Sequence, residues 1–387
     1  MPGVFHHLFV QAIRSYGTLA LLRSLSIVGL NKDKGEHCRS AGGAIRPHYW
    51  SRSPGLDGRN EIDFETLGKK TMPTHKLHIA LLAGGTSGER EVSLNGAAGV
   101  EKALDPEKFL VRRYDPATDL ARLATDAPEI DFAFILLHGL HGEDGTMQGF
   151  LDLLGIPYQG SGVLGSAIAM DKHLAKELYR LNGLPVADWR IVSNDARISG
   201  AEVVESFGLP VVIKPVHEGS SLGLTLARSE EQFLQGIERA LRHDSQVMVE
   251  KYIKGRELTV GVFGNRDLTA LPVIEIVPGP GFDFFDYDAK YKEGATEEIC
   301  PARINGTITA QAQRYGLAAH RALRLRGYSR TDMILEPSGA LYLLETNTIP
   351  GMTATSLMPR AAATHGLPFP QFLEILIELG MEGRAKK

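Results

Sequence analysis

Two short runs near the C-terminal end of the chain place acidic and amide side chains at the spacing of a β-hairpin. The runs are RTDMILE and ALYLLETN, and the tripeptide PSG separates them. If the serine and glycine of that tripeptide form a two-residue turn, Asp332 lies opposite Glu345 and Arg330 lies opposite Asn347. Because side chains alternate between the two faces of a strand, all four then project from one face of the hairpin.

This pairing sets two carboxylates against each other. Like charges that are directly opposed destabilise a sheet. A divalent cation removes the repulsion, and the side-chain oxygens of Asp332, Glu345 and Asn347 suit Mg²⁺. The alternative is a solvated polar face with a different register. The spacing favours a magnesium site.

A second polar run, KPVHEGSSLGL, begins at Lys214 and follows the apolar run LPVVI, which is typical of a buried strand. A lysine at the end of a strand can reach phosphate oxygens, and the backbone N–H groups from Gly219 to Gly223 can cover them. The spacing is not that of a Walker loop, and the run alone also fits a glycine-rich turn. Beside a magnesium-binding hairpin it indicates a nucleotide, because nucleotides bind together with Mg²⁺.

Two further polar runs follow predicted strands, at the position where α/β folds bind ligands. GGTSGEREVSLN follows KLHIALLAGG, and HGLHGEDGTMQG overlaps the end of IDFAFILLHG. The first run lacks the G-x-G-x-x-G spacing, which argues against a dinucleotide site. Glu89 and Glu91 either stabilise the N-terminus of the following helix, or one of them binds a substrate ammonium. His138 is either structural or a substrate ligand.

The elements around these runs alternate between strand and helix from Lys76 onward, which predicts an α/β fold that starts with a mostly parallel sheet. Helices are predicted at 92–104, 147–155 and 170–183, with glycine caps at Gly155 and Gly183. Strands are predicted at 189–193, 210–215, 246–253 and 256–264, with the last two continuing the same sheet. A long helix around 310–326, the hairpin and a closing helix complete the chain.

Composition excludes several classes of protein. The 387 residues are 43% hydrophobic and 23% charged, which is ordinary for a globular protein of two or three domains. The net charge of -4 provides no basic surface for nucleic acid. Cys38 and Cys300 cannot form a disulfide framework, which favours a reducing cytoplasm. No run approaches the roughly 20 apolar residues of a membrane span.

Residues 1–71 differ from the rest of the chain. No acidic residue precedes Asp33, and residues 36–60 are rich in Arg, Ser, Gly and Pro, which favours disorder. The segment is either a transit peptide or upstream sequence translated from an incorrect start codon, with Met72 close to the true start. In both cases we expect it to lie outside the fold.

Together these runs resemble the D-alanine–D-alanine ligase family of the ATP-grasp superfamily, from about Lys76 to the C-terminus. The motifs that carry the resemblance are GGTSGEREVSLN, HGLHGEDGTMQG, MDKHLAK, KPVHEGSSLG, VEKYIKGRELTV, YDAKY, RTDMILE and LLETNTIPGMTATS. The resemblance implies a mixed α/β, three-domain ATP-grasp fold: an N-terminal substrate domain at 76–168, a central domain at 169–254 and a C-terminal catalytic and metal-binding domain at 255–387. ATP would be held between the last two.

The implied reaction is the ATP-dependent, ADP-forming joining of two D-alanines for peptidoglycan precursors. The carboxylate of the first D-alanine attacks the γ-phosphate of ATP, and the amine of the second attacks the resulting D-alanyl phosphate. The expected cofactors are ATP and two Mg²⁺ or Mn²⁺ ions. The family also implies a cytoplasmic homodimer that binds neither nucleic acid nor membrane.

The resemblance also assigns roles to individual residues. The ATP-binding residues would be Lys172, Lys214, Glu218, Ser221, Glu250, Lys251, Ile253, Glu257 and Lys290. The metal ligands would be Asp332, Glu345 and Asn347. Glu89 and His138 would bind the first D-alanine, and Ser356 and Leu357 the second. The catalytic residues would be Glu89, Ser220, Tyr291, Arg330 and Gly351, with Arg330 and the Gly351 N–H as oxyanion donors.

A lid at 282–293 would close over the site, tied down by a trio of Glu89, Ser220 and Tyr291. Tyrosine at 291 favours an amine nucleophile, because relatives that make the depsipeptide tend to carry phenylalanine there. Departures from the family pattern are mild: Leu140 and His141 in the second motif, and Thr346 between two metal ligands, where the strand points it to the opposite face.

The alternatives are a related ligase with another acid or amine substrate and a nucleotide-binding regulatory protein without catalysis. Glu89, His138 and Ser356 argue against the first alternative. The complete set of metal ligands together with Arg330 argues against the second.

Overall fold

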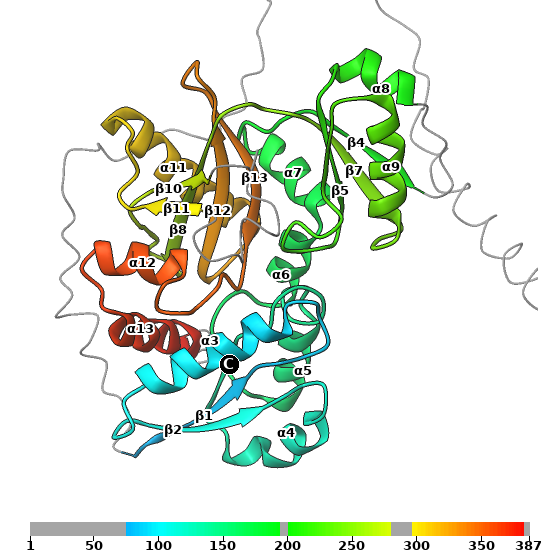
Figure 1. Cartoon of the computed structure of the whole chain (residues 1–387). Helices are drawn as coiled ribbons and strands as arrows, with labels where there is room; N and C mark the ends of the chain where they lie inside the picture. Colours follow the sequence, from blue (N-terminus) through cyan, green and yellow to red (C-terminus); the bar gives the residue numbers. More distant parts are fainter. Residues whose placement is uncertain (1–74, 194–199, 280–295, 383–387) are drawn as a thin grey trace, which may run out of the picture. The chain divides into compact units, whose positions relative to one another are not determined.

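The computed structural model describes residues 75–193, 200–279 and 296–382 (Figure 1). All the described residues belong to one compact unit, Thr71–Lys387. The predicted N-terminal extension, Lys290, Tyr291 and the lid at 282–293 lie outside the described residues.

The first sheet has three parallel strands, which confirms the predicted parallel sheet. Its strands are β1 (Leu77–Leu82), β2 (Phe109–Tyr114) and β3 (Phe132–Ile135), in the order β2-β1-β3. Helices α3 (Arg90–Ala103), α4 (Leu120–Asp126) and α5 (Thr146–Leu154) connect and follow them, with a short 3-10 helix at Ala127–Glu129. The polar runs after β1 and β3 therefore emerge side by side, because both follow the carboxyl ends of neighbouring parallel strands.

Two helices lead from this sheet to the next. They are α6 (Val163–Met170) and α7 (Lys172–Leu181). The carboxylate of Asp171 caps α7 by accepting a hydrogen bond from the Leu174 N–H, so Lys172 is the first residue of the helix. The helix ends at Leu181 with Asn182 as its C-cap, and the predicted cap, Gly183, follows in the left-handed conformation with φ +72°.

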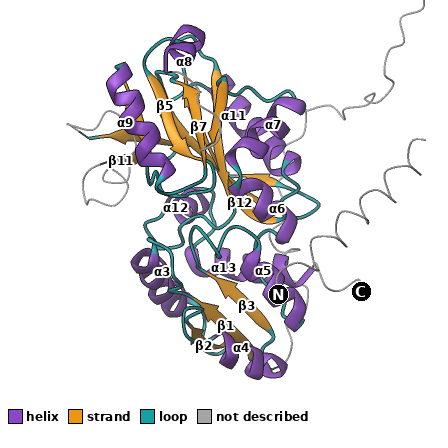
Figure 2. Cartoon of the chain, turned by 90° about the vertical axis from the view of Figure 1, so that its right-hand side faces the viewer, coloured by secondary structure: helices purple, strands orange, loops and turns teal. Residues whose placement is uncertain are grey.

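The second sheet is antiparallel. It contains β4 (Trp189–Ser193), β5 (Val211–Pro215), β6 (Thr225–Ala227) and β7 (Gln246–Lys251) in the order β4-β7-β5-β6, with α8 (Gly200–Phe207) and α9 (Glu230–Leu241) beside it (Figure 2). Strand β7 is paired on both sides. The next strand therefore cannot join it, and the expectation that 256–264 continues this sheet is wrong.

The third sheet is also antiparallel and has β8 (Arg256–Gly264) near its centre. The order is β11-β10-β8-β12-β13, with β9 (Thr269–Ala270) also on β8. The other strands are β10 (Ile274–Pro278), β11 (Thr296–Ile299), β12 (Gly327–Leu335) and β13 (Leu341–Asn347). Helix α11 (Gly306–Ala322) packs on β8 and β12 through a shared apolar cluster.

The β12–β13 hairpin reaches the predicted pairing by a different route. Its turn has three residues rather than two, since the Glu336 N–H bonds the Ala340 carbonyl and Gly339 takes a φ of +92°. This shifts the register by one residue near the turn. A β-bulge between Met333 and Asp332 shifts it back, so Asp332 pairs with Glu345 and Arg330 with Asn347.

Of the two C-terminal helices, α13 (Phe369–Glu382) packs against β3 of the first sheet, and α12 (Leu357–Thr364) packs against α13. One apolar cluster joins residues of β1 and β3 to Phe372 and Leu376 of α13 and to Phe263 of β8. The first and third sheets thus share a core, which fixes the loops near α12 relative to those after β1 and β3. No helix among the described residues is long and apolar enough to cross a membrane.

Candidate active site

Asp332 is the centre of a hydrogen-bonded group on one face of the hairpin. The Arg330 guanidinium donates to both of its carboxylate oxygens, from Nε to Oδ1 at 2.9 Å and from Nη2 to Oδ2 at 2.8 Å. Asn347 Nδ2 donates to Oδ2 at 3.1 Å, and the Thr259 hydroxyl of β8 donates to Oδ1. Although burial opposes the charge of Arg330, the neighbouring Asp332 raises the pKa of this guanidinium above its usual value.

Two oxygen-bearing side chains, Glu345 and Asn347, therefore stand on the same face as Asp332. Across the described residues, no group of three or more His, Cys, Asp or Glu side chains could hold a metal ion. A cation at this face would accordingly need the amide oxygen of Asn347 and oxygens from a substrate in addition to the two carboxylates. That mixed set of hard oxygen donors fits Mg²⁺, which seldom occupies an all-protein cage.

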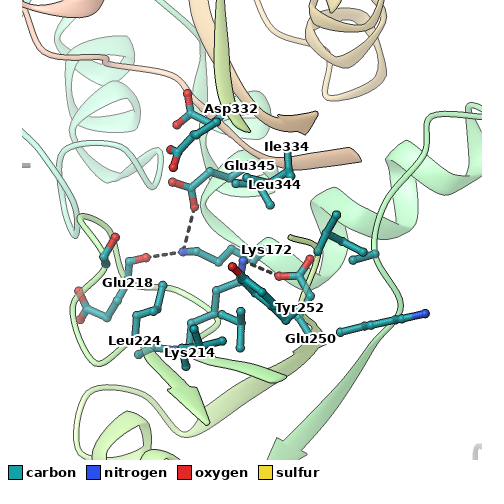
Figure 3. Close-up of a pocket in the computed structure, with 18 of the residues that line it drawn as sticks. Lys172, Lys214, Glu218, Leu224, Glu250, Tyr252, Asp332, Ile334, Leu344 and Glu345 are labelled. Atoms are coloured by element: carbon teal, nitrogen blue, oxygen red, sulfur yellow. Dashed lines mark hydrogen bonds and ion pairs between the residues drawn. The ribbon is translucent and has the colours of Figure 1, made fainter. Parts of the chain in front are cut away.

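A cavity lies between the second and third sheets. It encloses about 970 Å³, including space open to solvent, which is within the usual range for a small-molecule site. Figure 3 shows Asp332 and Glu345 on one side of it and Lys172, Lys214 and Glu250 on the other. Apolar side chains line it as well: Ala187, Val212, Leu222, Leu224, Leu226, Ile334 and Leu344. A flat apolar group with an anionic tail fits such a lining.

Two buried lysines face the hairpin across this cavity. Lys172, at the start of α7, donates to the Glu218 carbonyl, and its Nζ lies 3.9 Å from Glu345 Oε2 (Figure 3). Lys214, at the end of β5, places its Nζ 2.8 Å from Glu250 Oε2. Although burial opposes its charge, Glu250 holds the pKa of Lys214 above its usual value. The site thus offers two fixed cations to a phosphate.

A third lysine, which the sequence analysis missed, lies behind them. Lys176 is fully buried and forms an ion pair with the second oxygen of Glu250, and its Nζ lies 5.3 Å from the centre of the Trp189 ring. Burial lowers the pKa of Lys176. Burial also opposes the charge of Glu250, yet the two lysines hold its pKa below the usual value. Lys172 and Lys176 are four residues apart on α7, and residues at this spacing lie on the same side of a helix. This spacing was the sequence signal that could have predicted the position of Lys176.

Glu89 connects the loops after β1, β3 and β5. It precedes α3 but does not cap it, and its carboxylate instead accepts a hydrogen bond from Ser220. A methyl group at Gly139 or at Gly219 would lie 3.2 Å from Glu89 Oε2, so both glycines leave room for this carboxylate. Ser220 and Ser221 have φ values of +48° and +60°, a strained conformation for residues with side chains. Such strain is typical of functional loops.

The loop after β3 carries a second carboxyl group that the sequence analysis did not assign. Glu143 accepts hydrogen bonds from the Gly139 N–H and from the Ile349 N–H. Burial, with Glu89 nearby, raises the pKa of Glu143 to about 8. His138 is also buried, and burial lowers its pKa, which keeps the imidazole neutral at physiological pH.

The segment after β13 brings Gly351 and Ser356 together. A methyl group at Gly351 would lie 3.2 Å from the Ser356 hydroxyl, which also accepts from the Thr353 N–H. Leu357 begins α12, and its buried side chain belongs to the core shared with α13. The Ser356 hydroxyl is therefore hydrogen-bonded to Thr353 within its own segment, and the side chain of Leu357 is committed to packing.

The other predicted ATP contacts line the cavity: Glu218, Ser221, Lys251, Ile253 and Glu257.

The side chain of Thr346 points away from the cavity, as predicted, and is buried. Its hydroxyl accepts a hydrogen bond of 2.6 Å from Tyr179 of α7 and lies 2.9 Å from the Thr331 hydroxyl. Two polar neighbours thus accommodate this departure from the family pattern and link α7 to the hairpin.

Comparison with known proteins shows which protein family this chain matches. The family model for the C-terminus of D-ala D-ala ligases matches residues 178–378, and that for the N-terminus matches residues 116–161. The D-alanine–D-alanine ligase of Desulfotalea psychrophila is 64% identical over 308 residues, covering 79% of this chain and 96% of the relative. That of Syntrophobacter fumaroxidans is 56% identical over 311 residues, covering 80% and 100%.

Solved structures with a similar fold are D-alanine–D-alanine ligases or related ligases. The D-alanine–D-alanine ligase from Bacillus anthracis complexed with ATP superposes with a TM-score of 0.70 at 32% identity, covering 80% of this chain and 98% of that one. A D-Ala:D-Ser ligase from Enterococcus faecalis superposes with a TM-score of 0.68 at 32% identity, covering 79% and 99%.

Proposed function

Because this chain belongs to the D-alanine–D-alanine ligase family, we propose that its cavity holds ATP with the phosphates between the lysines and the hairpin. The predicted family, ATP-grasp fold and ATP-dependent ligase activity are confirmed by the relatives and the solved structures. The observation that carries the proposed binding mode is the placement of Lys172 and Lys214 opposite Asp332 and Glu345 across one cavity.

For the nucleotide, we assign the apolar lining to adenine and the buried Glu250 and neighbouring Ile253 to its polar edge. Glu257 is assigned to the ribose. Glu218, Ser221, Lys251 and Lys290 are the remaining proposed contacts. Lys172 and Lys214 would neutralise phosphate charge without reorganisation, because both ammonium groups are already held in place.

For the metal, Asp332, Glu345 and Asn347 would hold two Mg²⁺ or Mn²⁺ ions. Asn347 would turn its amide oxygen, rather than Nδ2, toward the site. Bound divalent ions supply charge neutralisation of the phosphates during phosphoryl transfer. Arg330 remains paired with Asp332, which orients the guanidinium toward the reacting groups.

For the amino acids, Glu89 would bind the ammonium of the first D-alanine with His138 beside it. The carboxylate of the first D-alanine attacks the γ-phosphorus of ATP and displaces ADP. The neutral amine of the second D-alanine then attacks the acyl carbon of D-alanyl phosphate, loses a proton and displaces phosphate. Arg330 and the Gly351 N–H would stabilise the oxyanion. Ser356 would form the second subsite together with the backbone of Leu357, whose side chain is packed in the core. Removing one such donor typically costs about 10²- to 10³-fold in rate. Ser220, Tyr291 and a lid at 282–293 would exclude water.

We also propose domain boundaries, an oligomeric state and a cellular location. The catalytic fold would comprise domains at 76–168, 169–254 and 255–387, with residues 1–71 outside it. We place a homodimer in the cytoplasm, in line with two cysteines and no disulfide framework. Mass spectrometry of the native N-terminus tests the first point, since a start near Met72 would remove the extension.

The test of the reaction is phosphate release from ATP and Mg²⁺ with D-alanine, L-alanine, D-lactate or D-serine, followed by mass analysis of the products. Phosphate release that requires D-alanine and yields the dipeptide supports the proposal. ATP binding without turnover on D-alanine would retain the nucleotide site and overturn the substrate assignment. A mixed D-alanyl-D-serine product would place the chain with the D-Ala:D-Ser ligase that it also resembles.

A further inference from the structure

The carboxyl group of Glu143 joins two loops that belong to different parts of the fold. Its Oε2 accepts a hydrogen bond of 2.9 Å from the Gly139 N–H, and its Oε1 accepts one of 3.2 Å from the Ile349 N–H, 206 residues further along the chain. We propose that Glu143 is a positioning residue that holds the loop binding the first D-alanine in register with the loop that carries the oxyanion donor. This inference rests on the proposed function.

Both ends of this connection lie next to groups with proposed roles. Gly139 follows His138, and the Glu89 carboxylate fits against Gly139. Ile349 lies two residues before Gly351, and the His138 ring also hydrogen-bonds to the backbone of Ile349. A small shift between these loops would move the first substrate relative to the oxyanion donor, and such misplacement is costly because the reaction needs near-attack geometry.

The charges around Glu143 connect this contact to substrate binding. Glu89, Arg330 and Tyr328 are the ionisable groups that interact electrostatically with Glu143. Burial, with Glu89, raises the pKa of Glu143 to about 8, whereas the two backbone hydrogen bonds and Arg330 oppose this rise. An ionised carboxylate accepts at both oxygens, whereas a protonated one uses an oxygen as a donor. A substrate ammonium beside Glu89 would favour the ionised form and so both hydrogen bonds.

The same loop offers a matched control. Asp144 is the next residue. Within the described part of the chain, its carboxylate accepts only from nearby backbone, the His141 N–H at 2.8 Å and the Thr146 N–H at 2.9 Å. It therefore supports the loop without reaching the segment after β13. Glu143→Gln removes the charge and leaves one acceptor oxygen, and Glu143→Asp keeps the charge but shortens the side chain so that it cannot span both N–H groups.

The experiment compares steady-state kinetics of wild type, Glu143→Gln, Glu143→Asp and Asp144→Asn. For both Glu143 variants we expect kcat/KM for D-alanine to fall about 10- to 100-fold, as for a lost hydrogen bond to a charged group, while KM for ATP stays within twofold. Asp144→Asn should stay within about threefold of wild type. A role of charge alone predicts normal activity for Glu143→Asp, and that result would overturn the proposal.

A measurement on the unaltered enzyme covers the case in which the variants fail to fold. Amide hydrogen exchange at Gly139 and Ile349 should slow together when D-alanine is added to enzyme that holds ADP and Mg²⁺. Independent exchange at the two amides, or Glu143 variants with normal kinetics for D-alanine, would refute the positioning role. Absence of any dipeptide from wild type would instead refute the proposed function itself.

Discussion

Three buried charged side chains beside the cavity neutralise one another. A single carboxylate, Glu250, neutralises two ammonium groups: Lys176 at one oxygen and Lys214 at the other, with Nζ 2.8 Å from Oε2. The side chains of Glu250, Lys176 and Lys214 are only 4%, 0% and 9% exposed. Replacing Glu250 by glutamine would leave two like charges buried without a counterion.

We expect Glu250→Gln to lower the free energy of unfolding of the ligand-free protein by about 3–5 kcal/mol, the usual cost of breaking a buried ion pair from one side. Lys176→Met should cost less, about 1–2 kcal/mol, because Glu250 keeps Lys214 as a partner and because burial already disfavours the charge on Lys176. The double variant should be more stable than Glu250→Gln alone, since it removes one uncompensated cation. This corresponds to a coupling energy of about 1–3 kcal/mol.

Urea denaturation followed by circular dichroism measures these differences at pH 7.5. The pH dependence supplies a second check on the same group. The folded-state pKa of Glu250 is held below its usual value of 4.5, so its contribution to stability is present above that value and is lost as the pH falls through the folded pKa. The difference in the free energy of unfolding between wild type and Glu250→Gln should therefore narrow in acid, below pH 4.5.

Two results would refute this reasoning. If Glu250→Gln lies within about 1 kcal/mol of wild type, the lysines do not depend on this carboxylate as their counterion. If the effects of Glu250→Gln and Lys176→Met simply add, the two groups are not coupled, because contacting charges should show an interaction energy.

Thr346, Glu345 and Glu143 each make an interaction whose loss can be measured. Thr346→Val should cost about 1–3 kcal/mol of stability in urea denaturation, because it leaves the buried Tyr179 hydroxyl without its 2.6 Å partner; the double variant with Tyr179→Phe should regain most of it, and an additive loss would contradict this. Glu345→Gln should raise the Mg²⁺ concentration needed for half-maximal ATP turnover at least about tenfold, because even outer-shell partners of metals contribute that much; an unchanged Mg²⁺ titration would exclude Glu345 as a ligand. The folded-state pKa of Glu143 is raised to about 8. The contribution of Glu143 to the free energy of unfolding should therefore fall as the pH rises from 4.5 to 8, by at most about 1.4 kcal/mol per pH unit, and Glu143→Gln should lack this fall. If wild type and variant show parallel plots of unfolding free energy against pH, the raised pKa is refuted.

In the β12–β13 hairpin the predicted residue pairing is correct, although the predicted turn length is not. The expected two-residue turn is wrong, but the β-bulge between Met333 and Asp332 compensates for the three-residue turn, and Asp332 still pairs with Glu345. Neither the turn length nor the bulge has a strong local signal, because the sequence PSG fits both turns. The register was predictable chiefly because the polar residues had to share one face.

Other features depended on pairings that no local pattern encodes. Strand β2 reads FLVRRY and lies at the edge of its sheet with several side chains exposed, so it lacks the apolar run that marks β1 and β3. The assignment of β8 to a new sheet required knowing that β7 already had two neighbours. Lys176 and Glu143 were within quoted motifs, but only their partners, Glu250 and Ile349, show what they do.

The sequence by itself determined the chemistry available to this protein: the α/β class, the lysines at the ends of helix and strand, the opposed acidic residues and the family to which they belong. These are local properties of residue type and spacing, which periodicity and motif order report directly. Only the tertiary structure decided which of these groups share one cavity and which charges neutralise one another. Burial and long-range packing set those relations, because Glu250 acquires two lysines, and Glu143 a second loop, from segments far apart in the chain.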